Sequence, residues 1–153
     1  MEQAIRSSLT GTVLVSACLL GLKTRWDGSD CHSEQALQAI SGQCAIPICP
    51  EQLGGLPTPR APAEINRGDG YNVLNGQAGV LAQDGRDVTE NYLRGAQQVW
   101  KLAEMFSAHR AILKEGSPSC GVLRIKREGK DAPGMGVTAA LLKRKGIAVE
   151  GVQ

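Results

Sequence analysis

Short apolar segments alternate with longer amphipathic segments along most of the chain. Four of the short segments are rich in branched aliphatic residues, and they cover positions 12–17, 45–49, 110–113 and 147–149. Segments of this kind predict buried strands. Short buried strands that alternate with helices indicate a parallel or mostly parallel sheet covered by helices, so the sequence predicts a Rossmann-like α/β fold.

Three segments between or after these strands have the pattern of helices. Ser33 is a suitable N-cap for a helix that runs to about residue 40. The clearest helix begins at Thr89, where apolar residues recur every three or four positions as far as about His109. The last helix covers about 138–145, and Gly146 follows it as a C-terminal stop.

The segment 71–87 differs from the rest of the chain. The turn pairs Asn75-Gly76 and Asp84-Gly85 stand on either side of the apolar pair Val80-Leu81. Asn-Gly and Asp-Gly are favoured in two-residue hairpin turns. We therefore expect a small β-hairpin inserted between the second strand and the helix at Thr89.

Length and composition fit one domain over residues 1–153, with residues 1–11 expected to be a flexible N-terminal extension. No stretch approaches the roughly 18 apolar residues of a membrane span. The N-terminus lacks the pattern of a signal peptide, so a cytoplasmic protein is expected. The net charge of +2 gives weak support for binding a large polyanion, and no DNA or membrane partner is expected.

The five cysteines carry the candidate chemistry. Cytosolic thiols are kept reduced, which makes a disulfide framework a poor explanation. Cys18 follows the first predicted strand, Cys49 ends the second and Cys120 lies in the loop after the third, and the carboxyl ends of parallel strands meet at one edge of a sheet. Cys31 falls in a loop or helix start and Cys44 at the opposite edge, so the first three should converge.

Three convergent thiols admit several interpretations. A structural zinc site needs four ligands and usually paired spacing, and the chain has no C-x-x-C. Buried thiols or a redox pair remain open, as does an iron–sulfur cluster with one iron free of protein ligands. The glycines form no ordered phosphate-binding loop, so no nucleotide cofactor is expected.

Six strings together resemble the thiouracil desulfidase family in its short single-domain form. In family order they are VSACLLG (15–21), RWDG (25–28), CPEQLGGLP (49–57), PRAPAE (59–64), DVTE (87–90) and KEGSPSCG (114–121). The resemblance extends over nearly the whole chain. Thr24, where many relatives carry cysteine, and Trp26, where tyrosine is commoner, depart from the pattern without touching the three cysteines.

The resemblance implies a [4Fe-4S] cluster held by Cys18, Cys49 and Cys120, with the fourth iron open to a substrate sulfur. It also implies catalytic roles for an acidic residue and a serine, which match Glu51 and Ser117. The implied reaction is non-redox desulfuration of a thiolated pyrimidine to its oxo form with release of hydrosulfide. Glu51 could equally be a solvated or helix-capping carboxylate, and Ser117 a turn residue bonded to its own backbone.

Further substrate contacts are expected from the loops around these motifs. Arg25, Asp27 and Arg60 are candidates for gripping the base, ribose or phosphate, although Arg60 could instead pair with a carboxylate. Gly116 and Ser119 lie in the loop whose backbone N–H groups could bind the pyrimidine.

Two other functions stay open at this point. One is a non-catalytic iron–sulfur sensor or binding module, and the other is desulfuration of thiolated tRNA. The expected partner is a small thiolated pyrimidine or its nucleotide, with the protein a monomer or homodimer.

Overall fold

A computed structural model describes residues 11–153. Its centre is a four-stranded parallel sheet in the order β2-β1-β5-β8. The strands are β1 (Thr12–Ser16), β2 (Cys44–Ile48), β5 (Arg110–Lys114) and β8 (Ala148–Val152). The four apolar segments therefore form the sheet, which confirms the predicted α/β fold.

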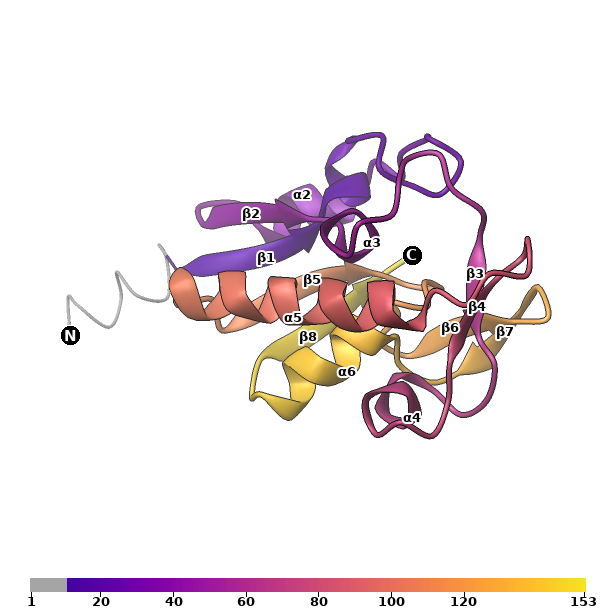
Figure 1. Ribbon diagram of the computed structural model, residues 1–153. Helices are drawn as coiled ribbons and strands as arrows, with labels where there is room; N and C mark the ends of the chain where they lie inside the picture. The colour runs from indigo at the N-terminus through magenta and orange to yellow at the C-terminus, as the bar shows by residue number, and fades with distance from the viewer. Residues whose placement is uncertain (1–10) are drawn as a thin grey trace.

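Helices cover both faces of this sheet (Figure 1). One face packs against α5 (Thr89–Met105) and α6 (Val137–Arg144), through a core that includes Leu14 and Leu113. The opposite face packs against η1 (Ala17–Leu20) and α2 (Glu34–Ala39), through a core that includes Val13 and Val15. Successive residues of a strand point to opposite faces of the sheet. Because both faces are buried here, these strands are continuous apolar runs in the sequence.

The predicted helices are present with small differences at their ends. The Ser33 hydroxyl caps α2 by accepting a hydrogen bond from the Ala36 N–H at 3.1 Å. Helix α5 ends at Met105, four residues before the predicted end. Ser107 adopts a left-handed φ of 54°, and the Ala108 N–H returns to the Ala103 carbonyl. This closing pattern ends a helix whatever apolar residues follow.

An antiparallel pair is inserted between β2 and α5, as predicted, but one of its strands lies before the predicted segment 71–87. Residues Gly70–Leu74 form a short helix, α4, with Asn75 as its C-cap. Strand β4 (Val80–Ala82) pairs with β3 (Ala63–Ile65), an earlier strand that the pattern did not indicate. The chain does reverse at Asp84-Gly85, where the Ala82 N–H donates to the Arg86 carbonyl.

A second antiparallel pair, β6 (Arg124–Arg127) and β7 (Lys130–Pro133), was not predicted. Charged residues predominate in both strands, and the cross-strand pair Ile125 and Ala132 is too short an apolar signal to indicate a strand. Both antiparallel pairs stand beyond the carboxyl ends of the parallel strands (Figure 1). A short helix, α3 (Pro50–Leu53), follows β2 at the same edge.

The expected N-terminal extension lies, apart from Gly11, outside the described residues. Over the part of the chain that the structure covers, no helix has the length and hydrophobicity needed to cross a bilayer.

Candidate functional site

The three strand-following cysteines line one cavity at the carboxyl edge of the sheet. Cys18 lies in η1 directly after β1, and Cys49 is the N-cap residue of α3 directly after β2. Cys120 lies in the loop after β5 and is 5% exposed. The cavity measures about 350 Å³, which is within the range of small-molecule sites.

The protein environment alone favours the protonated form of these thiols. Burial, followed by the neighbouring Cys31 and Glu51, raises the pKa of Cys18 to about 12. Burial is also the main reason that the pKa values of Cys49 and Cys120 are raised, and Glu51 adds to both. Thiolates at this site therefore need a positive partner such as iron, which would displace the protons on binding.

The spacing of the thiols suits a cluster better than a single ion. Among residues 11–153, no three His, Cys, Asp or Glu side chains lie close enough together to hold one metal ion. In an iron–sulfur cluster each thiolate binds a different iron atom, so the sulfurs do not have to meet at one point. Three separated thiols around one cavity fit that donor set.

Glu51 lies in the same cavity and forms a buried ion pair with Arg60. The guanidinium Nη2 is 3.1 Å from Glu51 Oε2, and the two side chains are 4% and 13% exposed. The same nitrogen donates to the Thr24 carbonyl at 3.0 Å and approaches Cys49 Sγ at 4.0 Å. Arg60 is thus a partner of a carboxylate, one of the two roles that the sequence left open.

A chain of hydroxyl groups connects Glu51 to the Cys120 loop. Ser119 donates its hydroxyl proton to Glu51 Oε1, and its oxygen is 2.9 Å from the hydroxyl oxygen of Ser117. Because Ser119 has one hydroxyl proton, Ser117 must be the donor in the contact between the two serines. The proton order is therefore Ser117 to Ser119 to Glu51.

Ser117 also holds the turn that carries Cys120. Its hydroxyl oxygen accepts hydrogen bonds from the N–H groups of Ser119 at 3.1 Å and Cys120 at 3.0 Å. Ser117 lines the cavity as well, so both roles considered for it from the sequence are compatible with its position.

The Cys120 loop is fixed from two further sides. The buried Glu115 carboxylate accepts hydrogen bonds from the N–H groups of Val122, Leu123 and Arg124, at distances between 2.8 and 3.4 Å. A Cβ on Gly136 would lie 2.4 Å from the carbonyl carbon of Ser119, so only glycine allows this approach.

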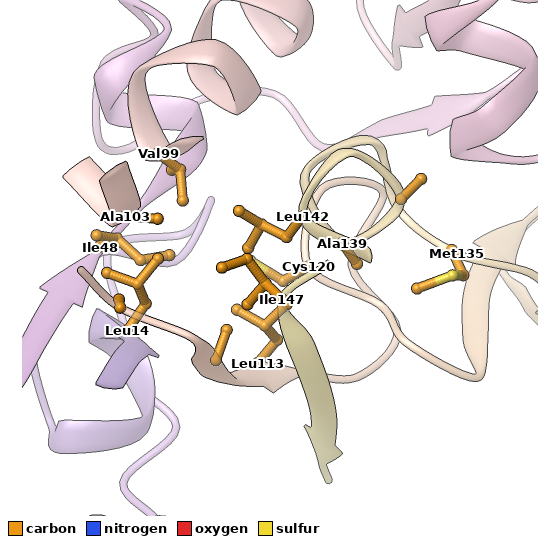
Figure 2. Packing of buried hydrophobic residues seen from close by; sticks show 13 residues of the cluster. Leu14, Ile48, Val99, Ala103, Leu113, Cys120, Met135, Ala139, Leu142 and Ile147 are labelled. Carbon is orange, nitrogen blue, oxygen red and sulfur yellow. The ribbon is translucent and has the colours of Figure 1, made fainter. Parts of the chain in front are cut away.

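Cys120 itself lies within the apolar core (Figure 2). Its neighbours in that cluster include Leu113 of β5 and Ala139 of α6. The third thiol is therefore positioned by the packing of α6 on the sheet.

The remaining predicted contacts separate into three groups. Arg25 and Gly116 line the cavity. Ser119 is fully buried behind Glu51, away from the cavity wall. Asp27 is exposed, lies outside the cavity lining and accepts hydrogen bonds from Ser29, which lower its carboxyl pKa. The Gly116 N–H donates to the Arg124 carbonyl, so that donor is used within the protein.

The sequence analysis missed several residues at the site. Tyr92, Lys114, Arg124 and Lys126 all line the cavity. Tyr92 was absent from the predicted apolar stripe of α5, and the two later cations sit on a strand that was not predicted. Cys31, expected apart from the other thiols, donates its N–H to the Cys18 carbonyl at 2.9 Å.

Comparisons with known proteins agree on one family. The family model described as 2-thiouracil desulfurase matches residues 13–151. The uncharacterized protein YbbK of Bacillus subtilis (strain 168) is 46% identical over 140 residues, covering 90% of this chain and 93% of its own length.

A solved structure, the [4Fe-4S]-dependent thiouracil desulfidase TudS, is similar with a TM-score of 0.75 and 42% identity. The similarity covers 92% of this chain and 89% of that protein. The chain therefore belongs to the 2-thiouracil desulfurase family.

Proposed function

We propose that this protein holds a [4Fe-4S] cluster through Cys18, Cys49 and Cys120 and removes sulfur from a thiolated pyrimidine by hydrolysis. The observation that carries the proposal is the meeting of three thiols and the Glu51 carboxylate in one cavity. The cluster dependence of the similar desulfidase supports it.

The reaction replaces a ring C=S by C=O and requires no net redox change. Water supplies the oxygen atom, and the sulfur leaves as hydrosulfide. When bound, the cluster would supply an iron without a protein ligand, a Lewis acid with affinity for sulfur. Everything else has to come from side chains around the cavity.

Glu51 is the proposed base for the attacking water. Arg60 fixes the carboxylate from one side and Ser119 from the other, which leaves its orientation toward the cavity well defined. The hydroxyl chain runs toward Glu51, so Ser117 donates to Ser119 and Ser119 donates to the carboxylate, which holds Oε1 in place. Ser117 lies at the cavity end of this chain, beside the space for the substrate.

The charges at the cavity wall favour a phosphorylated substrate over the free base. Arg25, Lys114, Arg124 and Lys126 all line the cavity. Asp131 forms ion pairs with Arg124 and Lys126, and Glu64 and Glu115 also line the cavity, so these carboxylates offset part of the positive charge. A nucleoside monophosphate would bring its phosphate to the remaining cations, so we propose the nucleotide as the preferred form.

The test is anaerobic purification and cluster reconstitution, followed by sulfide release from 4-thiouracil, 4-thiouridine, its 5′-monophosphate and thiolated tRNA. About four irons per chain, sulfide release and the highest kcat/KM for the monophosphate are expected. Raising the salt concentration should weaken that preference, because salt screens exposed charges. Replacing Cys49 by serine should abolish cluster and activity, whereas Cys44→Ser, at the far edge of the sheet, should change neither.

Two outcomes would favour other functions, and a third would refute the cluster. A stable cluster without sulfide release from any thiolated pyrimidine would favour the non-catalytic sensor or binding module. Sulfide release from thiolated tRNA alone would favour the tRNA substrate. A colourless protein without iron after anaerobic reconstitution would refute the cluster.

A further inference from the structure

Tyr92 occupies a position in the cavity that the proposed mechanism does not use. It lies in α5, is 4% exposed and lines the cavity together with Cys49, Cys120 and Glu51. A buried aromatic residue on a helix would ordinarily be assigned to the core. Here the ring borders the space where the substrate would bind.

The close packing of α5 on α3 fixes this position. A Cβ on Gly95 would lie 2.1 Å from the Pro50 carbonyl oxygen, and one on Gly54 would lie 2.0 Å from the Asn91 carbonyl oxygen. The two backbones therefore touch one turn from Tyr92. Because Pro50 directly follows Cys49, the contact places the tyrosine beside that thiol.

The Tyr92 hydroxyl has no protein partner among residues 11–153, and it is not one of the polar atoms sealed from solvent without a partner. It is therefore open to the cavity that its ring lines. Buried tyrosine hydroxyls normally have a hydrogen-bond partner, so this hydroxyl is suited to bind a ligand in the cavity.

This hydroxyl keeps its proton. The ordinary pKa of a tyrosine hydroxyl is about 10, well above neutral pH. At neutral pH it is a hydrogen-bond donor. The two serines of the site are already in use, because Ser117 donates to Ser119 and Ser119 donates to Glu51.

We propose that the Tyr92 hydroxyl donates a hydrogen bond to the unreacting ring carbonyl oxygen of the pyrimidine and contributes to its recognition. The inference rests on the proposed function, since it assumes a thiolated pyrimidine in this cavity. A pyrimidine that keeps one oxo group needs a donor for that oxygen, and Tyr92 is an uncommitted neutral one.

The test uses the cluster-loaded protein and the variant Tyr92→Phe, which keeps the packed ring and removes only the hydroxyl. Tyr71→Phe is the matched control, because Tyr71 lies outside the cavity lining. Its ring packs against Arg144, whose Cζ is 5.3 Å from the ring centroid. The substrates are 4-thiouracil, with its 2-oxo group, and pyrimidine-4-thione, which lacks that group. Binding of uracil, measured by calorimetry, gives a readout that does not depend on turnover.

We expect Tyr92→Phe to lower kcat/KM for 4-thiouracil by about 3- to 10-fold, the effect of losing one neutral hydrogen bond. Uracil binding should weaken by the same factor. With pyrimidine-4-thione the variant and the wild type should be equal, and Tyr71→Phe should match the wild type throughout.

Equal values for Tyr92→Phe and wild type with both 4-thiouracil and uracil would overturn the inference. An equal loss on both thiolated substrates, together with a shifted cluster reduction potential, would also overturn it and assign the hydroxyl to a cluster sulfur. If the wild type releases no sulfide, the proposed function fails. Unequal uracil binding by wild type and Tyr92→Phe would in that case still support the hydrogen bond.

Discussion

The Glu115→Gln substitution tests whether a buried carboxylate positions the loop that carries Cys120. Glu115 is 5% exposed. Its Oε1 accepts from the N–H groups of Val122 at 2.8 Å, Leu123 at 3.1 Å and Arg124 at 3.4 Å, and its Oε2 accepts from Leu123 at 3.1 Å. Glutamine has nearly the same shape but one acceptor oxygen and no charge.

The cost follows from these contacts. The charged acceptor is lost, and an amide NH₂ faces N–H groups that also donate. Hydrogen bonds to charged groups are worth about 1.5–3 kcal/mol, and an unpaired buried donor costs about 1–3 kcal/mol. Because the amide oxygen still accepts from part of the loop, we expect Glu115→Gln to lower the free energy of unfolding by about 2–4 kcal/mol.

Urea unfolding of the cluster-free protein measures this change, and iron content after reconstitution measures the position of Cys120. The matched control is Glu104→Gln, because Glu104 is an exposed residue of α5. We expect the control to unfold like the wild type and to bind a full complement of iron. Equal stability and equal iron content in Glu115→Gln and Glu104→Gln would refute the reasoning.

Three further predictions concern the same site. Gly136→Ala should reduce iron incorporation, measured by iron content per folded chain, because the added methyl meets the Ser119 backbone. The cluster-free protein should lose stability above about pH 9, because burial holds the pKa of Cys18 near 12 when folded against 9.0 in the unfolded chain. The unfolded chain then loses the thiol proton at a lower pH than the folded protein does, which lowers the free energy of unfolding by about 1 kcal/mol at pH 10. Urea unfolding measures this loss of stability, which should be absent in Cys18→Ser. Arg60→Met should destabilise the cluster-free protein by about 3 kcal/mol, because it leaves the Glu51 charge buried and unpaired.

Each of these predictions has an outcome that contradicts it. Full iron content in Gly136→Ala would mean that α6 does not fix the Cys120 loop. An identical pH dependence in wild type and Cys18→Ser would mean that this thiol is not strongly buried in solution. For the ion pair, Glu51→Gln combined with Arg60→Met should cost less than the sum of the two single changes, and simple additivity would argue against the contact.

The sequence alone determined the sheet and the convergence of the three cysteines. Apolar runs of strand length can be buried on both faces only in a sheet covered by helices, and parallel strands bring their carboxyl ends to one edge. Cys18, Cys49 and Cys120 therefore had to approach one another once each was recognised to follow a strand. The six sequence motifs indicated the family, and the comparisons confirmed it.

Only the tertiary structure decided what surrounds those cysteines. Strands β3 and β6 carry no periodic apolar signal, because they form short charged or mixed pairs beyond the sheet, so the cations of the cavity could not be located. The side of α5 that faces the site depends on contact between its backbone and Pro50, which places Tyr92 at the cavity. The partners of Arg60 and Ser119 lie 9 and 68 residues away at Glu51, a distance over which local pattern carries no information.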